Sequence, residues 1–159
     1  MMRKSKEELL RELLARLRTD LATLERAHRA TCEGATHEEA KPENDKDTRA
    51  LEQSYLARGQ ATRIEELRAS VAAVATLSHD DLGEGRVALG AVVLVEENGK
   101  ELALLLAPGG GGERIGDGEV QVVTPGSPLG RCLLGASSGQ DVQLVTAGRE
   151  RTLHVVRVQ

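Results

Sequence analysis

The chain has 159 residues, and its formal net charge of −4 excludes an electrostatic basis for independent duplex DNA binding, which depends on Lys and Arg neutralising phosphates. One Tyr is its only aromatic residue, so a core must be built from Leu, Val, Ile and Ala, and such a chain can be stable if part of it is a coiled coil. Its apolar runs are too short to span a membrane, and charges interrupt the apolar residues at its amino terminus, so we expect a cytoplasmic protein whose partner is another protein.

A first helix is predicted over residues 6–29, because leucines recur there at alternating steps of four and three. The repeating residues are Leu10, Leu14, Leu17, Leu21 and Leu24. Charged residues occupy the other faces, so this helix has one apolar stripe and requires a partner. An irregular stretch is predicted over residues 31–44.

The partner is a second helix that begins near residue 45 and ends near residue 77. The residues that repeat the three-and-four step are Ile64, Leu67, Val71 and Val74. A lone Gly59 costs about 1 kcal/mol against Ala, which a long paired helix tolerates. Residues 1–79 are therefore predicted to form an antiparallel coiled-coil hairpin. Both stripes are satisfied within one chain, so we expect a monomer.

A second domain is predicted over residues 84–159, after a polar linker that contains glycine. The dipeptide Asn98-Gly99 tolerates positive φ at both positions of a type I′ turn, so it predicts a hairpin. The predicted strands cover residues 92–95, 101–106, 119–123, 142–145 and 152–158. Ser127 as N-cap, Pro128 at the first position and Gly135 at the end predict one short helix. The predicted fold class is α+β, with the helical hairpin followed by a small antiparallel β-rich domain.

Acidic residues concentrate between the two helices. They are Glu33, Glu38, Glu39, Glu43, Asp45 and Asp47. One interpretation is structural: Asn44 caps the second helix and nearby carboxylates complement the positive end of its dipole. The other is chemical, because Mg²⁺ prefers one or two carboxylate oxygens together with waters and substrate phosphates. The predicted helical hairpin could therefore place carboxylates in the active site of another protein.

The segment SPLGRCLLG is followed by Gly-x-Asp-Val at residues 139–142, and the helical half carries Glu43-Asn44, Glu52-Gln53 and Ile64-Glu65-Glu66-Leu67. In both halves these motifs resemble the GreA/GreB family of bacterial transcription elongation factors, and the first is similar to the FKBP-like domain of that family. In the hairpin, Glu52-Gln53 follows Glu43-Asn44 with the family spacing. One position departs from the family: the Asp three residues before the tip Glu is Ala40 here.

The resemblance implies a factor that binds bacterial RNA polymerase and inserts its acidic tip into the secondary channel. There it would assist the Mg-dependent cleavage of backtracked transcripts, contacting the nascent RNA only indirectly. It implies that Glu43 and Glu39 are donated to the polymerase active site and share a Mg²⁺ there, with Asp45 and Asp47 as supporting acids. The factor itself would be no enzyme and would have no cofactor of its own.

Two further functions compete with this hypothesis. Ala40 favours a regulator or inhibitor that occupies the same channel without stimulating cleavage. The heptad stripes alone would also suit a structural coiled-coil interaction protein. A prolyl isomerase is disfavoured, because its pocket is built mainly from aromatic residues and Tyr55 lies in the helical half. Cys32 and Cys132 lie far apart and outside any zinc-type spacing, which predicts reduced thiols.

Overall fold

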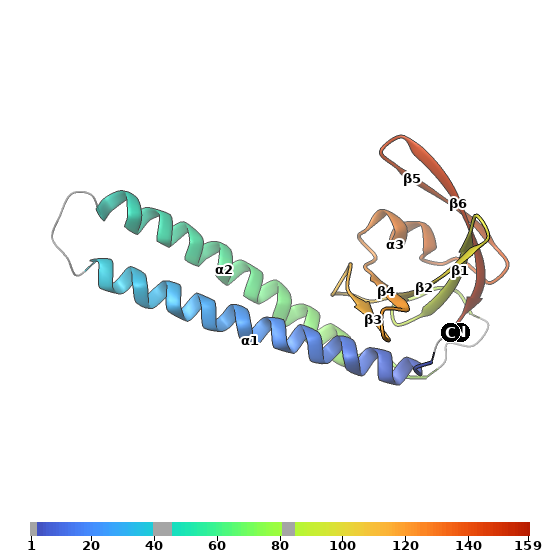
Figure 1. The fold of residues 1–159 in the computed structure, drawn as a ribbon, viewed down its shortest axis with the longest axis horizontal. Helices are drawn as coiled ribbons and strands as arrows, with labels where there is room; N and C mark the ends of the chain where they lie inside the picture. The colour runs from blue at the N-terminus through green and yellow to red at the C-terminus, as the bar shows by residue number, and fades with distance from the viewer. Residues whose placement is uncertain (1–2, 40–45, 81–84) are drawn as a thin grey trace. The chain divides into compact units, whose positions relative to one another are not determined.

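The computed structural model describes residues 3–39, 46–80 and 85–159. Along the chain, a pair of long helices precedes a six-stranded, mostly antiparallel sheet, so the predicted α+β class is confirmed (Figure 1). The chain divides into two compact units: Met1–Ala15 groups with Ala72–Gln159, and Arg16–Val71 forms the second unit. We call them the sheet unit and the hairpin unit. The predicted domain limits, 1–79 and 84–159, stay predictions.

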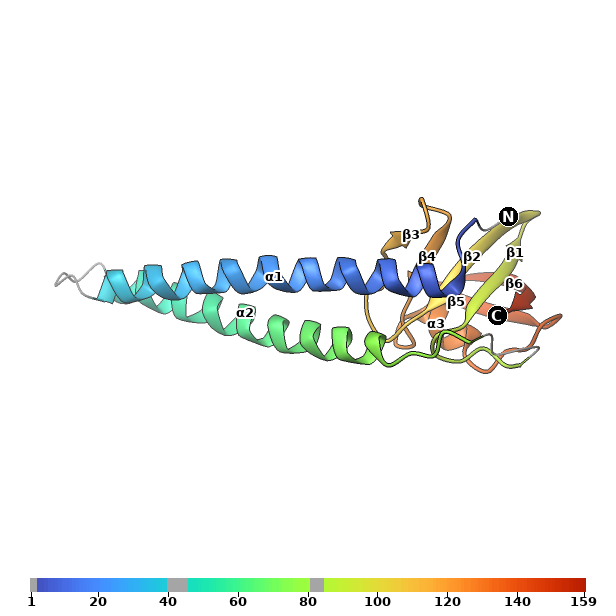
Figure 2. The same ribbon diagram turned by 90° about the horizontal axis from the view of Figure 1, so that it is seen from below.

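The two long helices are α1 (Lys6–Glu39) and α2 (Lys46–Ala75), which lie side by side in both views (Figures 1 and 2). The helix α1 continues to Glu39, so the irregular stretch predicted from residue 31 is wrong for residues 31–39. Gly34 is the one strong helix breaker in that stretch, and its cost of about 1 kcal/mol is small beside the continued hydrogen bonding of a long helix. No helix among the described residues is long and apolar enough to cross a membrane.

The apolar stripes of the two helices are buried unevenly. In the hairpin unit, Leu17, Ile64 and Leu67 are buried, with at most 7% of each residue exposed. The predicted stripe residues Leu21 and Leu24 are half-buried. The apolar contact between the helices is therefore tighter towards the amino-terminal end of α1 than towards its carboxyl-terminal end.

The sheet has the order β3-β4-β2-β1-β6-β5. Its strands are β1 (Val92–Glu97), β2 (Lys100–Leu106), β3 (Arg114–Ile115), β4 (Val120–Val123), β5 (Asp141–Thr146) and β6 (Arg149–Val158). Neighbouring strands are antiparallel except β2 and β4, which are parallel. The predicted turn between β1 and β2 is present, since Asn98 and Gly99 both have positive φ and Glu97 pairs with Lys100.

A short helix, α3 (Pro128–Leu133), contributes to the main apolar core, which includes one face of the sheet. The N-cap is Ser127, as predicted, and its Oγ accepts a hydrogen bond from the backbone N–H of Gly130 at 3.0 Å. The sheet residues of this core come from β1, β2, β4, β5 and β6. The core contains no aromatic side chain, which agrees with the expectation from composition.

The first turns of α1 belong to the sheet unit. Leu9 and Leu13 are both fully buried there. Glu12 accepts a hydrogen bond from the backbone N–H of Gly116 at 3.0 Å. A Cβ placed on Gly116 would lie 2.8 Å from Cδ2 of Leu9, so the turn after β3 packs directly against the helix. The amino-terminal part of α1 is thus one structural layer of the sheet unit.

Candidate functional site

The four acidic residues predicted at the tip fall in or beside the connection between the helices. Glu43 and Asp45 lie outside the described residues, as does Ala40. Glu39 is the last residue of α1 and Asp47 is the second residue of α2, and the structure describes the backbone of both but not their side chains. The structure therefore places two of the acids at facing helix ends, and their proposed shared metal site stays a prediction.

Contacts between the helices confirm that the ends at Glu39 and Lys46 face each other. Arg68 of α2 donates a hydrogen bond to Glu25 of α1 at 2.8 Å, and this partly exposed ion pair raises the pKa of the arginine. Nearer the connection, Nδ1 of His28 lies 3.3 Å from Oε1 of Gln60. From the first contact to the second, the residue number rises on α1, from Glu25 to His28, and falls on α2, from Arg68 to Gln60. This is the pattern of an antiparallel pair.

The seam between the helices becomes polar towards the connection. The half-buried residues there include Thr31 and Gly34 of α1 and Ala50, Gln53, Ala57 and Gln60 of α2. A Cβ on Gly34 would lie 3.9 Å from Nε2 of Gln53, so these two residues face each other. Oε1 of Gln53 is buried without a hydrogen-bond partner among the described residues. This part of the hairpin is therefore held by polar and small contacts, without the leucines that hold its other end.

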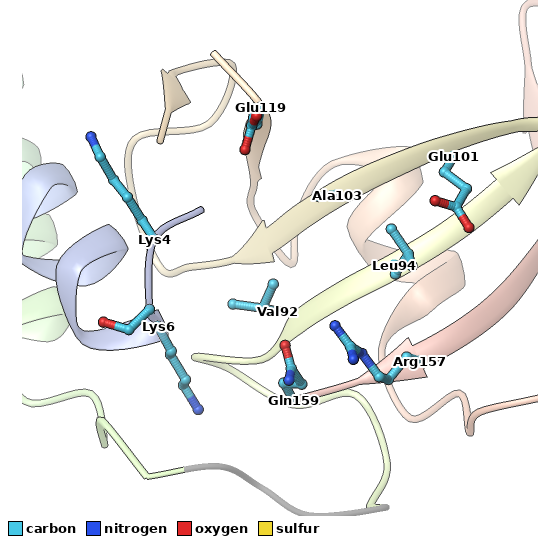
Figure 3. Close-up of a pocket in the computed structure, with 10 residues that line it drawn as sticks. Lys4, Lys6, Val92, Leu94, Glu101, Ala103, Glu119, Arg157 and Gln159 are labelled. Carbon is cyan, nitrogen blue, oxygen red and sulfur yellow. The ribbon is translucent and has the colours of Figure 1, made fainter. Parts of the chain in front are cut away.

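The sheet unit has a cavity of about 530 Å³ on the face of β1 and β2 next to the start of α1. Figure 3 shows Val92 of β1 between the segment carrying Lys4 and Lys6 and the β6 residue Arg157, with Leu94 further along β1. Lys4 points away from Arg157, whereas Lys6 points downward in this view (Figure 3).

Both lysines of this cavity are engaged in contacts beside it. Lys4 lies 3.0 Å from a carboxylate oxygen of Glu12 and 3.4 Å from Asp117, and the hydrogen bond to Glu12 raises the pKa of Lys4. Lys6 donates to the backbone oxygen of Asp80 at 2.7 Å. Both lysines thus contact residues that do not line the cavity.

A second groove, of about 450 Å³, lies beside α3. The loop residues Gly111 and Gly112, Ser127 and Leu129 near the start of α3, and Arg151 of β6 are among its lining residues. None of its lining residues is aromatic.

Other residues with chemical potential do not assemble into a site within the described part of the chain. No group of three or more His, Cys, Asp or Glu side chains could hold a metal ion in residues 3–39, 46–80 and 85–159. Nδ1 of His154 lies 2.6 Å from Oδ1 of Asp141 on an exposed surface of β5 and β6. Cys132 forms no disulfide, and burial raises the pKa of its thiol, which lowers its reactivity.

The sequence analysis missed a set of exposed apolar residues on α2. Leu51, Tyr55 and Leu56 each have more than half of their surface exposed. The signal was present in the sequence, since Leu51 and Tyr55 are four residues apart and neither falls on the positions that continue the stripe of Ile64 and Leu67.

The described residues form a two-helix hairpin and a β-rich unit. No family model matches the chain. No curated protein matches it. Several solved structures do match.

The GreA factor homolog 1 (Gfh1) of Thermus thermophilus is 20% identical, with a TM-score of 0.39, and the match covers 99% of this chain and 96% of that one. Gfh1 of Thermus aquaticus is also 20% identical, with a TM-score of 0.41 and coverage of 91% and 92%. A prokaryotic transcription elongation factor GreA/GreB from Nitrosomonas europaea is 19% identical, with a TM-score of 0.37 and coverage of 58% and 78%. These structures are GreA/GreB-like factors, the group that the sequence resembles.

Proposed function

We propose that this protein is a transcription elongation factor that binds bacterial RNA polymerase and delivers the acidic connection of its hairpin to the polymerase active site. The observation that supports the proposal most directly is the antiparallel pairing of α1 and α2, because the sequence that joins these two helices is rich in acidic residues. At a rise of 1.5 Å per residue, the 34 residues of α1 are on the order of 50 Å long. A helix of that length can carry a short connection deep into a channel of a large partner.

The chemistry of the connection suits a metal ion shared with the partner. Its candidate donors are carboxylates, the preferred ligands of Mg²⁺, and Glu43 and Glu39 would supply them, with Asp45 and Asp47 in support. When bound, such an ion would activate a water molecule and stabilise the scissile phosphate oxygens. The role of the chain is to hold these carboxylates at the end of a rigid hairpin, while the polymerase remains the enzyme.

The test is a cleavage assay on backtracked elongation complexes with Mg²⁺. We expect the wild-type protein to shorten the transcripts. Glu43→Ala should lower the stimulated cleavage rate about 100-fold, as expected for loss of a group that stabilises the transition state. Polymerase binding should remain within about twofold, because a single carboxylate at a protein surface contributes little to affinity.

The matched control for this test is Glu33→Ala, which removes an exposed carboxylate from α1 outside the connection. It should leave cleavage unchanged. If Glu43→Ala retains full activity while Asp45→Ala or Asp47→Ala loses it, the assignment of Glu43 is wrong and the later acids hold the metal.

A second candidate function is occupation of the same channel without cleavage. It is favoured by Ala40, which stands where the family carries an Asp. A wild-type protein that slows elongation and never shortens a transcript would replace the first function with this one. The purely structural coiled-coil alternative predicts no effect on polymerase in either assay.

A further inference from the structure

The face of α2 that points away from α1 carries two large apolar side chains and an arginine. Leu51 has 54% of its surface exposed and Tyr55 has 62%, and Arg58 is exposed as well. They stand at positions i, i+4 and i+7, which a helix with about 3.6 residues per turn brings to one side. We call these three residues the outer face of α2.

This face is not used by the hairpin itself. At about 100° per residue, the outer face lies roughly opposite the seam positions Gln53 and Gln60. Those seam residues are half-buried and reach α1, through Gly34 for Gln53 and through His28 for Gln60. Arg58 forms no ion pair with any residue in the described part of the chain. The fold therefore does not explain why large apolar residues stand on the outer face.

The outward positions further along α2 have a different composition. Thr62, Glu66, Ala69 and Ala73 continue the same side of the helix, and all are small or polar. On the outward side of α2, large apolar side chains are therefore confined to the half of the helix nearest the connection. Under the proposed function, that half of α2 would enter the polymerase channel before the rest of the helix.

The size of the patch decides against a second copy of this chain. Even when fully covered, Leu51 and Tyr55 contribute on the order of 250 Å². A stable dimer requires about 800 Å² from each partner. A patch of this size instead suits an anchor within a larger interface, where Tyr and Arg dominate the binding energy.

We infer that the outer face of α2 is a contact surface for the protein wall of RNA polymerase, where Leu51 and Tyr55 enter an apolar recess and Arg58 meets a carboxylate at its border. The inference rests on the proposed function and adds a second point of attachment, separate from the acidic connection. Such a contact would fix the depth and the rotation of the hairpin in the channel. Covering exposed apolar surface and pairing an exposed arginine would supply its affinity.

The test compares two leucines on the same helix that have the same exposed fraction. Leu51 and Leu56 are each 54% exposed, but Leu56 lies on the flank of the seam, outside the outer face. Full-length variants Leu51→Ser, Tyr55→Ser and the double variant would compete with labelled wild-type protein for polymerase core enzyme free of nucleic acid. We expect the double variant to bind at least about tenfold more weakly. Leu56→Ser should change affinity less than about twofold.

Circular dichroism of each variant checks that the hairpin remains helical, which is expected because all the substituted positions are exposed. A photo-crosslinking amino acid at position 55 should form an adduct with a polymerase subunit, and the same group at position 56 should not. If the wild-type protein fails to compete for polymerase at all, both the proposed function and this inference are overturned. If the wild type competes and the double variant competes equally well, the inference alone is overturned.

Two other outcomes identify a different occupant and also overturn the inference. A loss of affinity that appears with RNA-containing elongation complexes but not with the free core enzyme would mean that Tyr55 stacks on RNA. A wild-type dimer in sedimentation that dissociates in the double variant would mean that a second copy covers the face.

Discussion

At the residue scale, Gly130 shows why the segment SPLGRCLLG requires a glycine in the middle of α3. A Cβ built at this position would lie 1.9 Å from the backbone oxygen of Thr124 and 3.1 Å from Cα of Pro125. Both neighbours are backbone atoms, which cannot move aside as a flexible side chain can. The glycine lets α3 begin directly against the loop that follows β4, and so positions Leu133 in the main core.

We therefore predict that Gly130→Ala lowers the free energy of unfolding by about 3 kcal/mol or more, because overpacking against a backbone forces the helix to shift. Urea denaturation followed by circular dichroism measures the change. Gly126→Ala is the matched control, since a Cβ there meets nothing within 4 Å, and it should stay within about 0.5 kcal/mol of the wild type. Equal stability of the two variants would contradict the close approach to Thr124.

At the element scale, the hairpin has a leucine-rich end and a polar end. Gln53 and Gln60 occupy equivalent seam positions seven residues apart, one heptad. They differ in hydrogen bonding, because Oε1 of Gln60 is near Nδ1 of His28 whereas Oε1 of Gln53 is buried without a partner among the described residues. A buried acceptor without a donor costs about 1–3 kcal/mol.

Gln53→Leu should therefore stabilise the hairpin by about 1 kcal/mol relative to Gln60→Leu, which removes the acceptor near His28. Both variants add similar apolar volume at a seam position, so the difference between them isolates the hydrogen bond. The thermal transition followed by helical circular dichroism measures it. A larger gain for Gln60→Leu would show that the contact with His28 contributes nothing.

At the scale of the whole molecule, one helix takes part in two compact units. The first turns of α1, with Leu9 and Leu13 fully buried, belong to the sheet unit, whereas Leu21 belongs to the hairpin unit. A substitution on α1 should consequently affect one unit or the other according to its position. The stability of the sheet depends on residues that precede it by about a hundred positions, as the hydrogen bond from Gly116 to Glu12 shows, with a sequence separation of 104.

Leu9→Ala should destabilise the sheet unit by about 2–5 kcal/mol, the usual cost of removing a buried leucine side chain. Hydrogen exchange of the full chain would show reduced protection in β4, next to the turn that contacts Leu9. Leu21→Ala, at a half-buried position of the hairpin unit, should leave protection of β4 unchanged. Equal loss of protection from both substitutions would mean that the chain unfolds as a single unit.

The sequence alone determined the elements whose signals are local. The heptad spacing of leucines predicted the paired helices, Asn98-Gly99 predicted the hairpin between β1 and β2, and Ser127 with Pro128 predicted α3. These features depend on residues within a few positions of one another, so propensity and periodicity suffice to find them.

The tertiary structure decided the features that depend on contacts between distant residues. The parallel pairing of β2 with β4 and the packing of Leu9 against the turn after β3 have no local signature. The end of α1 at Glu39 was hidden from the sequence because one glycine weakens a helix without ending it. The sequence places Leu51 and Tyr55 off the predicted stripe, but only the tertiary structure shows that both side chains stay more than half exposed, because exposure depends on what the rest of the fold covers.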